Sequence, residues 1–198
     1  MVFTLTGCTI PQIDTNTSVD KQESIVIENN KEITVENCSL NGKRKNNVKV
    51  DIGVDFEDSQ RNYYSYTNGV GQVVYVEAEE LILQNDDIED VKSTGRYCSD
   101  EAKVPGVEAK DLDEGHIIAD SLGGNSNAYN ITPQDSDTNR HGEQSEMEGV
   151  IRDALYNGKE VLNFEAFITY ENEFTMVPSN YKYNFNIGNK EHIYNFSN

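Results

Sequence analysis

Apolar and polar residues alternate along several stretches of the chain, and this period of two limits its fold more than any other feature. The clearest runs cover residues 48–56, 162–170 and 181–187, where every second residue is apolar or aromatic. Such alternation is typical of strands with one face on a core and the other in water. Shorter runs at 63–66 and 72–83 predict two further strands. We therefore expect a mainly antiparallel sheet with one buried face.

A single long segment has helical spacing instead. Its apolar residues recur every three or four positions over 143–157 and are followed by Gly158, which can end a helix. Strands, one long helix and then further strands predict an α+β fold. A weak alternation on both sides of Asn29-Asn30 predicts a small hairpin over residues 24–35.

Charge and hydropathy exclude two classes of protein. The 198 residues carry 16 basic and 35 acidic side chains, a formal net charge of -19. Diffuse positive charge therefore cannot hold nucleic acid on this surface. No run reaches the roughly 18 apolar residues of a membrane-spanning helix. We expect a leader and linker over 1–22, an N-terminal strand region over 23–50, and the main domain over 51–198.

The cysteines indicate where the protein works. Residues Leu5 to Cys8 resemble a bacterial lipobox, in which the cysteine is lipidated, and the polar segment that follows suits a tether. This predicts an extracellular or cell-surface protein that is lipid-anchored at Cys8 without spanning the membrane. In that compartment Cys38 and Cys98 can form a disulfide. The alternative is that both are buried, unpaired thiols.

Most of the residues suited to chemistry fall within 110–148. The segment contains Asp113-Glu114-Gly115-His116, then Asn130-Ile-Thr-Pro-Gln134, then Asn139, and then Met147-Glu148. With this joint spacing it resembles the DNA/RNA non-specific endonucleases of the ββα-metal type, which include the DNA-entry nucleases. The resemblance covers about residues 51–198. It implies a ββα-metal motif and an endonuclease that hydrolyses DNA, or both DNA and RNA, leaving 5′-phosphates.

The resemblance also assigns roles. His116 is the expected general base, and an imidazole suits this because it titrates near neutral pH. Asn139 would bind one Mg²⁺ directly, with Mn²⁺ as a substitute, and Glu148 would act at the metal by holding one of its waters. Asn130 would orient the site or the phosphate. The residues expected to contact the substrate are Gln134 and Arg140.

Each assignment has a structural alternative. Asn139 could only cap a helix, Glu148 could only pair with Arg152, and Asn130 and Gln134 could only bond loop backbone.

The chain also departs from the family pattern. Glu114 stands where the family usually has Arg, which replaces a cation near the phosphate by an anion. An extra residue in Arg140-His141-Gly142 leaves Glu146 as an alternative to Glu148. Three other hypotheses stay open: a nuclease-fold binding module without efficient catalysis, a His-Asn-His nuclease that uses His116, Asn130 and His141, and a toxin.

Overall fold

The computed structural model describes residues 29–36, 38, 43–56, 60–89 and 101–198. Its main sheet has seven strands in the order β1-β2-β3-β4-β7-β8-β9. All neighbouring pairs are antiparallel except β1 and β2, which run parallel. The strands are β1 (Lys31–Ile33), β2 (Val48–Asp51), β3 (Tyr63–Thr67), β4 (Val73–Glu80), β7 (Val161–Thr169), β8 (Asn180–Ile187) and β9 (Lys190–Ser197).

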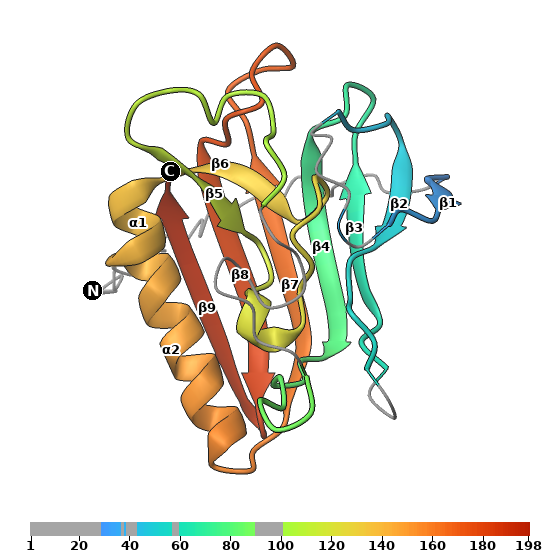
Figure 1. Cartoon of the computed structure of the whole chain (residues 1–198). Helices are drawn as coiled ribbons and strands as arrows, with labels where there is room; N and C mark the ends of the chain where they lie inside the picture. Colours follow the sequence, from blue (N-terminus) through green and yellow to red (C-terminus); the bar gives the residue numbers. More distant parts are fainter. Residues whose placement is uncertain (1–28, 37, 39–42, 57–59, 90–100) are drawn as a thin grey trace, which may run out of the picture.

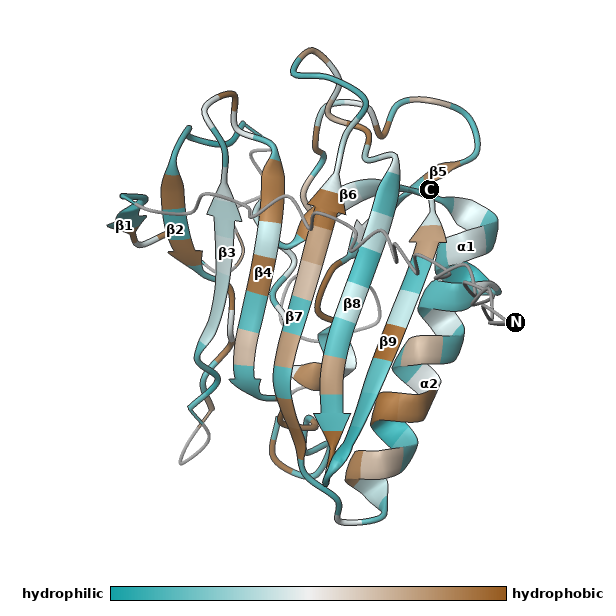
Figure 2. Ribbon diagram, turned by 180° about the vertical axis from the view of Figure 1, so that it is seen from behind, coloured by the Kyte–Doolittle hydropathy of each residue, from teal (hydrophilic) through white to brown (hydrophobic). Residues whose placement is uncertain are grey.

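A second layer lies on one face of this sheet (Figure 1). It contains the antiparallel pair β5 (Leu112–His116) and β6 (Ile131–Asp135), followed by α1 (Ser136–Arg140) and α2 (Glu143–Tyr156). The single-turn 3-10 helix η1 (Asp120–Leu122) lies in the connection between β5 and β6. Figure 2 shows the opposite face, over which no helix of the described residues lies. The α+β prediction is confirmed.

The core forms between these two layers, as the sequence periods predict. The inward residues of β7 and β8 are buried together with those of α2, and the aromatic rings of Tyr181 and Tyr183 stack at 6.3 Å. The buried residues of these three elements are Phe164, Ala166, Ile168, Tyr181, Tyr183, Phe185, Met147, Ile151 and Ala154. The helix expected over 143–157 and the strands expected over 162–170 and 181–187 are confirmed to within one residue.

Three elements differ from the sequence-based expectations. The N-terminal hairpin is wrong in its described half, because Lys31 to Ile33 pair in parallel with β2. The long strand expected over 48–56 ends at Asp51, because Gly53 makes only an isolated bridge to Gly124. A Cβ at Gly53 would collide with the carbonyl of Arg61. Strand β9 was not expected as a full strand, because half-buried and exposed residues dominate it.

The sheet continues across residue 50, where the sequence suggested a boundary, since β2 spans it. The predicted leader and linker, and Cys8 and Cys98, lie outside the described residues. Cys38 is disulfide-bonded, so the interpretation of Cys38 as a free thiol is wrong. Within the described ranges, no helix is both long and apolar enough to cross a membrane.

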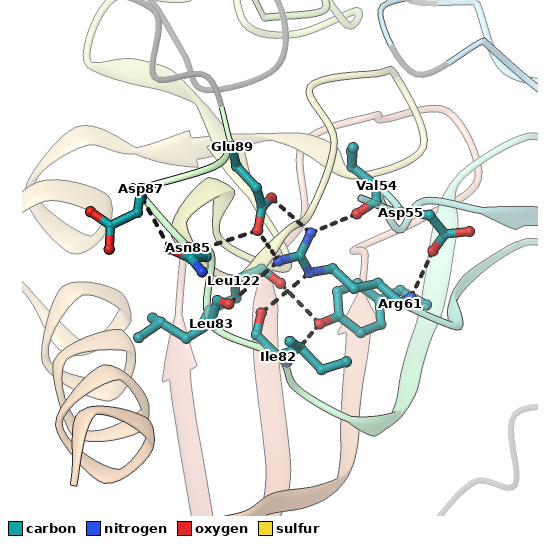
Figure 3. A network of polar contacts seen from close by, with 10 residues as sticks. Val54, Asp55, Arg61, Ile82, Leu83, Asn85, Asp87, Glu89 and Leu122 are labelled. Atoms are coloured by element: carbon teal, nitrogen blue, oxygen red, sulfur yellow. Dashed lines mark hydrogen bonds and ion pairs between the residues drawn. The ribbon is translucent and has the colours of Figure 1, made fainter. Parts of the chain in front are cut away.

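The buried ion pair of Arg61 and Glu89 lies next to the connection between β5 and β6 (Figure 3). The guanidinium of Arg61 donates to both carboxylate oxygens of Glu89, at 2.9 and 2.8 Å, and to the carbonyl of Val54 at 2.7 Å. Its stem passes so close to Gly123 (φ 82°) that a Cβ there would collide with it. Because Gly123 directly follows η1, this network fixes the position of η1.

Candidate active site

Asp113 joins strand β5 to helix α1. Its carboxylate accepts two hydrogen bonds from Arg140, both at 2.6 Å, and one from Asn139 Nδ2 at 3.4 Å. Burial opposes ionisation of this carboxyl, but the hydrogen bonds from Arg140, Ser136 and Asn139 outweigh that effect and lower its pKa. Asp113 therefore holds Asn139 next to β5.

Residues from β5, α1 and α2 meet at one cavity of about 350 Å³. His116 comes from the end of β5, Asn139 from α1 and Glu148 from α2. The remaining lining residues are Glu101, Glu114, Ala119, Asp120 and Ser121. The structure therefore brings together three of the residues that the sequence selected, although they are up to 32 positions apart (148 − 116).

His116 is partly buried, and its Nε2 lies 3.2 Å from the hydroxyl oxygen of Ser126. Burial disfavours the charged imidazolium and lowers the pKa of His116 to about 4. At neutral pH the ring is therefore uncharged and can accept a proton.

Glu148 is held from two sides. Its Oε1 accepts from Gln144 Nε2 at 2.8 Å, and its Oε2 lies 3.4 Å from Arg152 Nη1, one helical turn later. Burial raises the pKa of Glu148, and these two contacts act in the opposite direction. Glu148 thus lines the cavity and also makes the expected ion pair. Glu146 is exposed and does not line the cavity.

Asn139 lies inside α1 and does not cap a helix. The N-cap of α1 is Asp135, whose side chain accepts from Thr138 N at 2.9 Å, and α2 begins after Gly142. Nδ2 of Asn139 donates to Asp113, whereas Oδ1 accepts no hydrogen bond from the described residues. The amide oxygen of Asn139 is therefore available for a ligand in the cavity.

A family model for DNA/RNA non-specific endonucleases matches residues 46–189. The chain belongs to this family. It is therefore an enzyme of the nuclease class, and the resemblance found in the 110–148 segment is confirmed.

Solved structures show the same fold. NucA from Streptococcus agalactiae with no metal bound is 17% identical, with a TM-score of 0.51, over 72% of each chain. The same protein with a magnesium ion bound is 16% identical, also with a TM-score of 0.51, over 74% of this chain and 76% of NucA. No curated protein matches the sequence.

Three other residues proposed for the endonuclease site do not face the cavity. Asn130 is fully buried: Oδ1 accepts from Ile118 N at 3.0 Å, and Nδ2 donates to the carbonyls of Ile118 and Asn125 at 2.9 and 2.8 Å. Gln134 is only 1% exposed and does not line the cavity. Arg140 is exposed, but it pairs with Asp113 and does not line the cavity.

The structure also argues against the His-Asn-His hypothesis. His141 is exposed at the C-terminal end of α1 and does not line the cavity. The amide of Asn130, its proposed partner, is fully occupied by backbone groups.

Sequence reasoning missed Ser126 and Gln144, which contact His116 and Glu148. The only signal for Gln144 was its position four residues before Glu148, which places both on one helix face. No sequence signal distinguished Ser126.

The oxygen donors of the cavity suit a magnesium ion. Asn139 offers an amide oxygen and Glu148 a carboxylate. In the described part of the chain, no three His, Cys, Asp or Glu side chains form a cage for a metal. Mg²⁺ is commonly bound by one or two protein oxygens, with water and phosphate completing the shell. The residues present fit that mode.

Proposed function

We propose that this endonuclease hydrolyses phosphodiester bonds of DNA, or of both DNA and RNA, in a magnesium-dependent reaction with His116 as general base. The observation that carries the proposal is the meeting of His116, Asn139 and Glu148 at one cavity. A base and two hard oxygen donors in the same space are what metal-assisted phosphodiester hydrolysis needs.

Asn139 and Glu148 would hold the Mg²⁺, for which Mn²⁺ can substitute. When bound, the ion supplies positive charge that stabilises the phosphate in the transition state. Asp113 supports this arrangement because it holds the amide nitrogen of Asn139, which leaves the amide oxygen for the cation.

His116 would take a proton from the attacking water. The tautomer in which Nε2 donates to Ser126 leaves the lone pair of Nδ1 free to accept that proton. The lowered pKa keeps the ring unprotonated at neutral pH, so its lone pair is available for a proton.

The charge of the residues that line the cavity also affects how strongly the substrate binds. Glu114, which stands in place of an arginine, pairs with Lys103 at 2.6 Å, and this ion pair offsets the added negative charge. Glu101, Asp120 and Glu148 add further carboxylates to the lining. Attraction of a polyanionic substrate therefore depends on the divalent cation, and we expect the affinity to fall with added salt.

A plasmid-nicking assay with Mg²⁺, and with EDTA in its place, tests the proposal. We expect cleavage only with Mg²⁺, and a loss on the order of 10²-fold or more for His116→Ala, the contribution of a general base. His141→Ala is the matched control, because this exposed imidazole does not line the cavity. Equal rates for His116→Ala and the unmodified protein would remove His116 from the mechanism. No cleavage by the folded protein between about pH 6 and 9 would favour the binding-module hypothesis.

We also propose that the enzyme works outside the cytoplasm, held by a lipid on Cys8. The disulfide at Cys38 supports this location, because such bonds persist in oxidising compartments. Peptide mapping tests the proposal. A Cys38–Cys98 bond leaves Cys8 for the lipid, whereas a Cys8–Cys38 bond would exclude the anchor.

A further inference from the structure

Gln144 is a buried amide in the first half of α2, and it is the side chain that links two parts of the cavity. Its exposed fraction is 0% although the neighbouring Glu143 is exposed. A fully buried amide is destabilising unless its polar atoms are hydrogen-bonded. Its contacts therefore indicate why a glutamine occupies this position.

Nε2 of Gln144 has two hydrogens, and each has a partner at the cavity. One partner is the backbone carbonyl of His116, at 3.3 Å, and the other is Oε1 of Glu148, at 2.8 Å. The first contact attaches α2 to the end of β5, and the second orients the carboxylate. One amide nitrogen thus connects the element that carries the base to the residue proposed to hold the cation.

The oxygen of the same amide fixes its orientation. Oε1 of Gln144 lies 3.5 Å from Nε2 of Gln134, which is itself buried in β6, the neighbouring strand of β5. Gln134 packs so tightly against Gly115 that a Cβ there would collide with its amide. The oxygen of Gln144 therefore faces a donor, and its nitrogen faces His116 and Glu148.

We propose that Gln144 is a positioning residue that sets the separation and orientation of His116 and Glu148, and so the affinity of the site for its cation. This inference rests on the proposed function. Gln144 is buried and does not line the cavity, so it acts through its two partners without touching the substrate. Residues that orient metal-binding side chains in this way typically contribute 10- to 100-fold to metal affinity or activity.

The test compares Gln144→Met with Gln72→Met in the full chain. Methionine keeps the approximate size of glutamine but donates no hydrogen bond. Gln72 is a matched control: it is 2% exposed, and its Nε2 also donates twice, to the carbonyls of Asn172 at 2.8 Å and Thr175 at 2.7 Å. Gln72 does not line the cavity, so its loss should affect stability without affecting the cation site.

Calorimetric titration with Mg²⁺ in the absence of nucleic acid is the first measurement, and DNA nicking is the second. We expect Gln144→Met to raise the Mg²⁺ dissociation constant at least about tenfold. KM for DNA, measured at saturating Mg²⁺, should stay within about twofold of that of the unmodified protein. Gln72→Met should leave both constants within about twofold. Gln144→Asn, a shorter amide that keeps the position polar, should show the same loss as Gln144→Met and serves if methionine prevents folding.

An unchanged Mg²⁺ dissociation constant in a folded Gln144 variant would overturn the positioning role. An equal rise in Gln72→Met would do so as well, because the effect would then follow from general destabilisation. The proposed function is tested separately. It would be wrong if the unmodified protein neither bound Mg²⁺ nor nicked DNA.

Discussion

Replacing Asn130 by alanine should destabilise the fold strongly, although this residue does not touch the cavity. Its amide satisfies three backbone groups: the N–H and carbonyl of Ile118 and the carbonyl of Asn125. A buried polar group left without a partner costs about 1–3 kcal/mol. The three together give a loss of about 3 kcal/mol or more in the free energy of unfolding. That is a large part of the roughly 5–15 kcal/mol of a typical domain.

Asn127→Ala is the matched control for Asn130→Ala. Asn127 is in the same connection and is equally buried. Among the described residues, its side chain accepts only from Tyr129 N, at 2.9 Å, and its Nδ2 has no hydrogen-bond partner. We expect this variant to lose about 1 kcal/mol, the value of one hydrogen bond. Urea unfolding at neutral pH measures both losses. If Asn130→Ala lost no more stability than Asn127→Ala, the stabilising role assigned to the three hydrogen bonds of Asn130 would be refuted.

Two further predictions concern buried ionisable groups. Glu89→Ala should lower the free energy of unfolding by about 3 kcal/mol in a thermal or urea transition, because Arg61 would keep its burial and lose its carboxylate; a loss below about 1 kcal/mol would contradict this. Acidification from about pH 6.5 to about pH 4 should lower the free energy of unfolding more in the unmodified protein than in a His116→Gln variant. The reason is that the pKa of the histidine is near 6.5 in the unfolded chain and about 4 in the folded protein. In that interval the unfolded chain binds more protons, so the free energy of unfolding decreases as the pH is lowered. Equal losses in both proteins would show that His116 is not the cause.

The sequence predicts those parts of the fold whose apolar residues are periodic. Helix α2 and strands β7 and β8 repeat every 3.6 or two residues, so their buried faces can be read from the chain. Strand β5 (Leu112–His116) has one apolar residue and no such period, and helix α1 (Ser136–Arg140) buries none of its residues. These short elements are held by the contacts of Asp113 and Asp135, which no local pattern reveals.

The site was predictable to a similar degree. The spacing of His116, Asn139 and Glu148 selected three residues that do meet at the cavity. The same motif predicted that Asn130 orients the site or the phosphate and that Gln134 contacts the substrate, and the structure buries both. A sequence shows that an amide can form hydrogen bonds, but not whether its partner is the backbone behind the site or a ligand in front of it. That distinction depends on the path of the connection between β5 and β6.

The amides behind the cavity restrict how such an enzyme can change its substrate preference. Each of them is almost completely buried: Asn125, Asn127, Asn130, Gln134 and Gln144. Lys103 and Glu114, by contrast, form a partly exposed ion pair, and Glu114 lines the cavity. A mutant library confined to these two positions would vary the electrostatic potential met by an incoming strand and leave the folding energy nearly constant. Adaptation to a new polynucleotide should therefore occur by substitution of these two charged residues, while the buried amides stay unchanged.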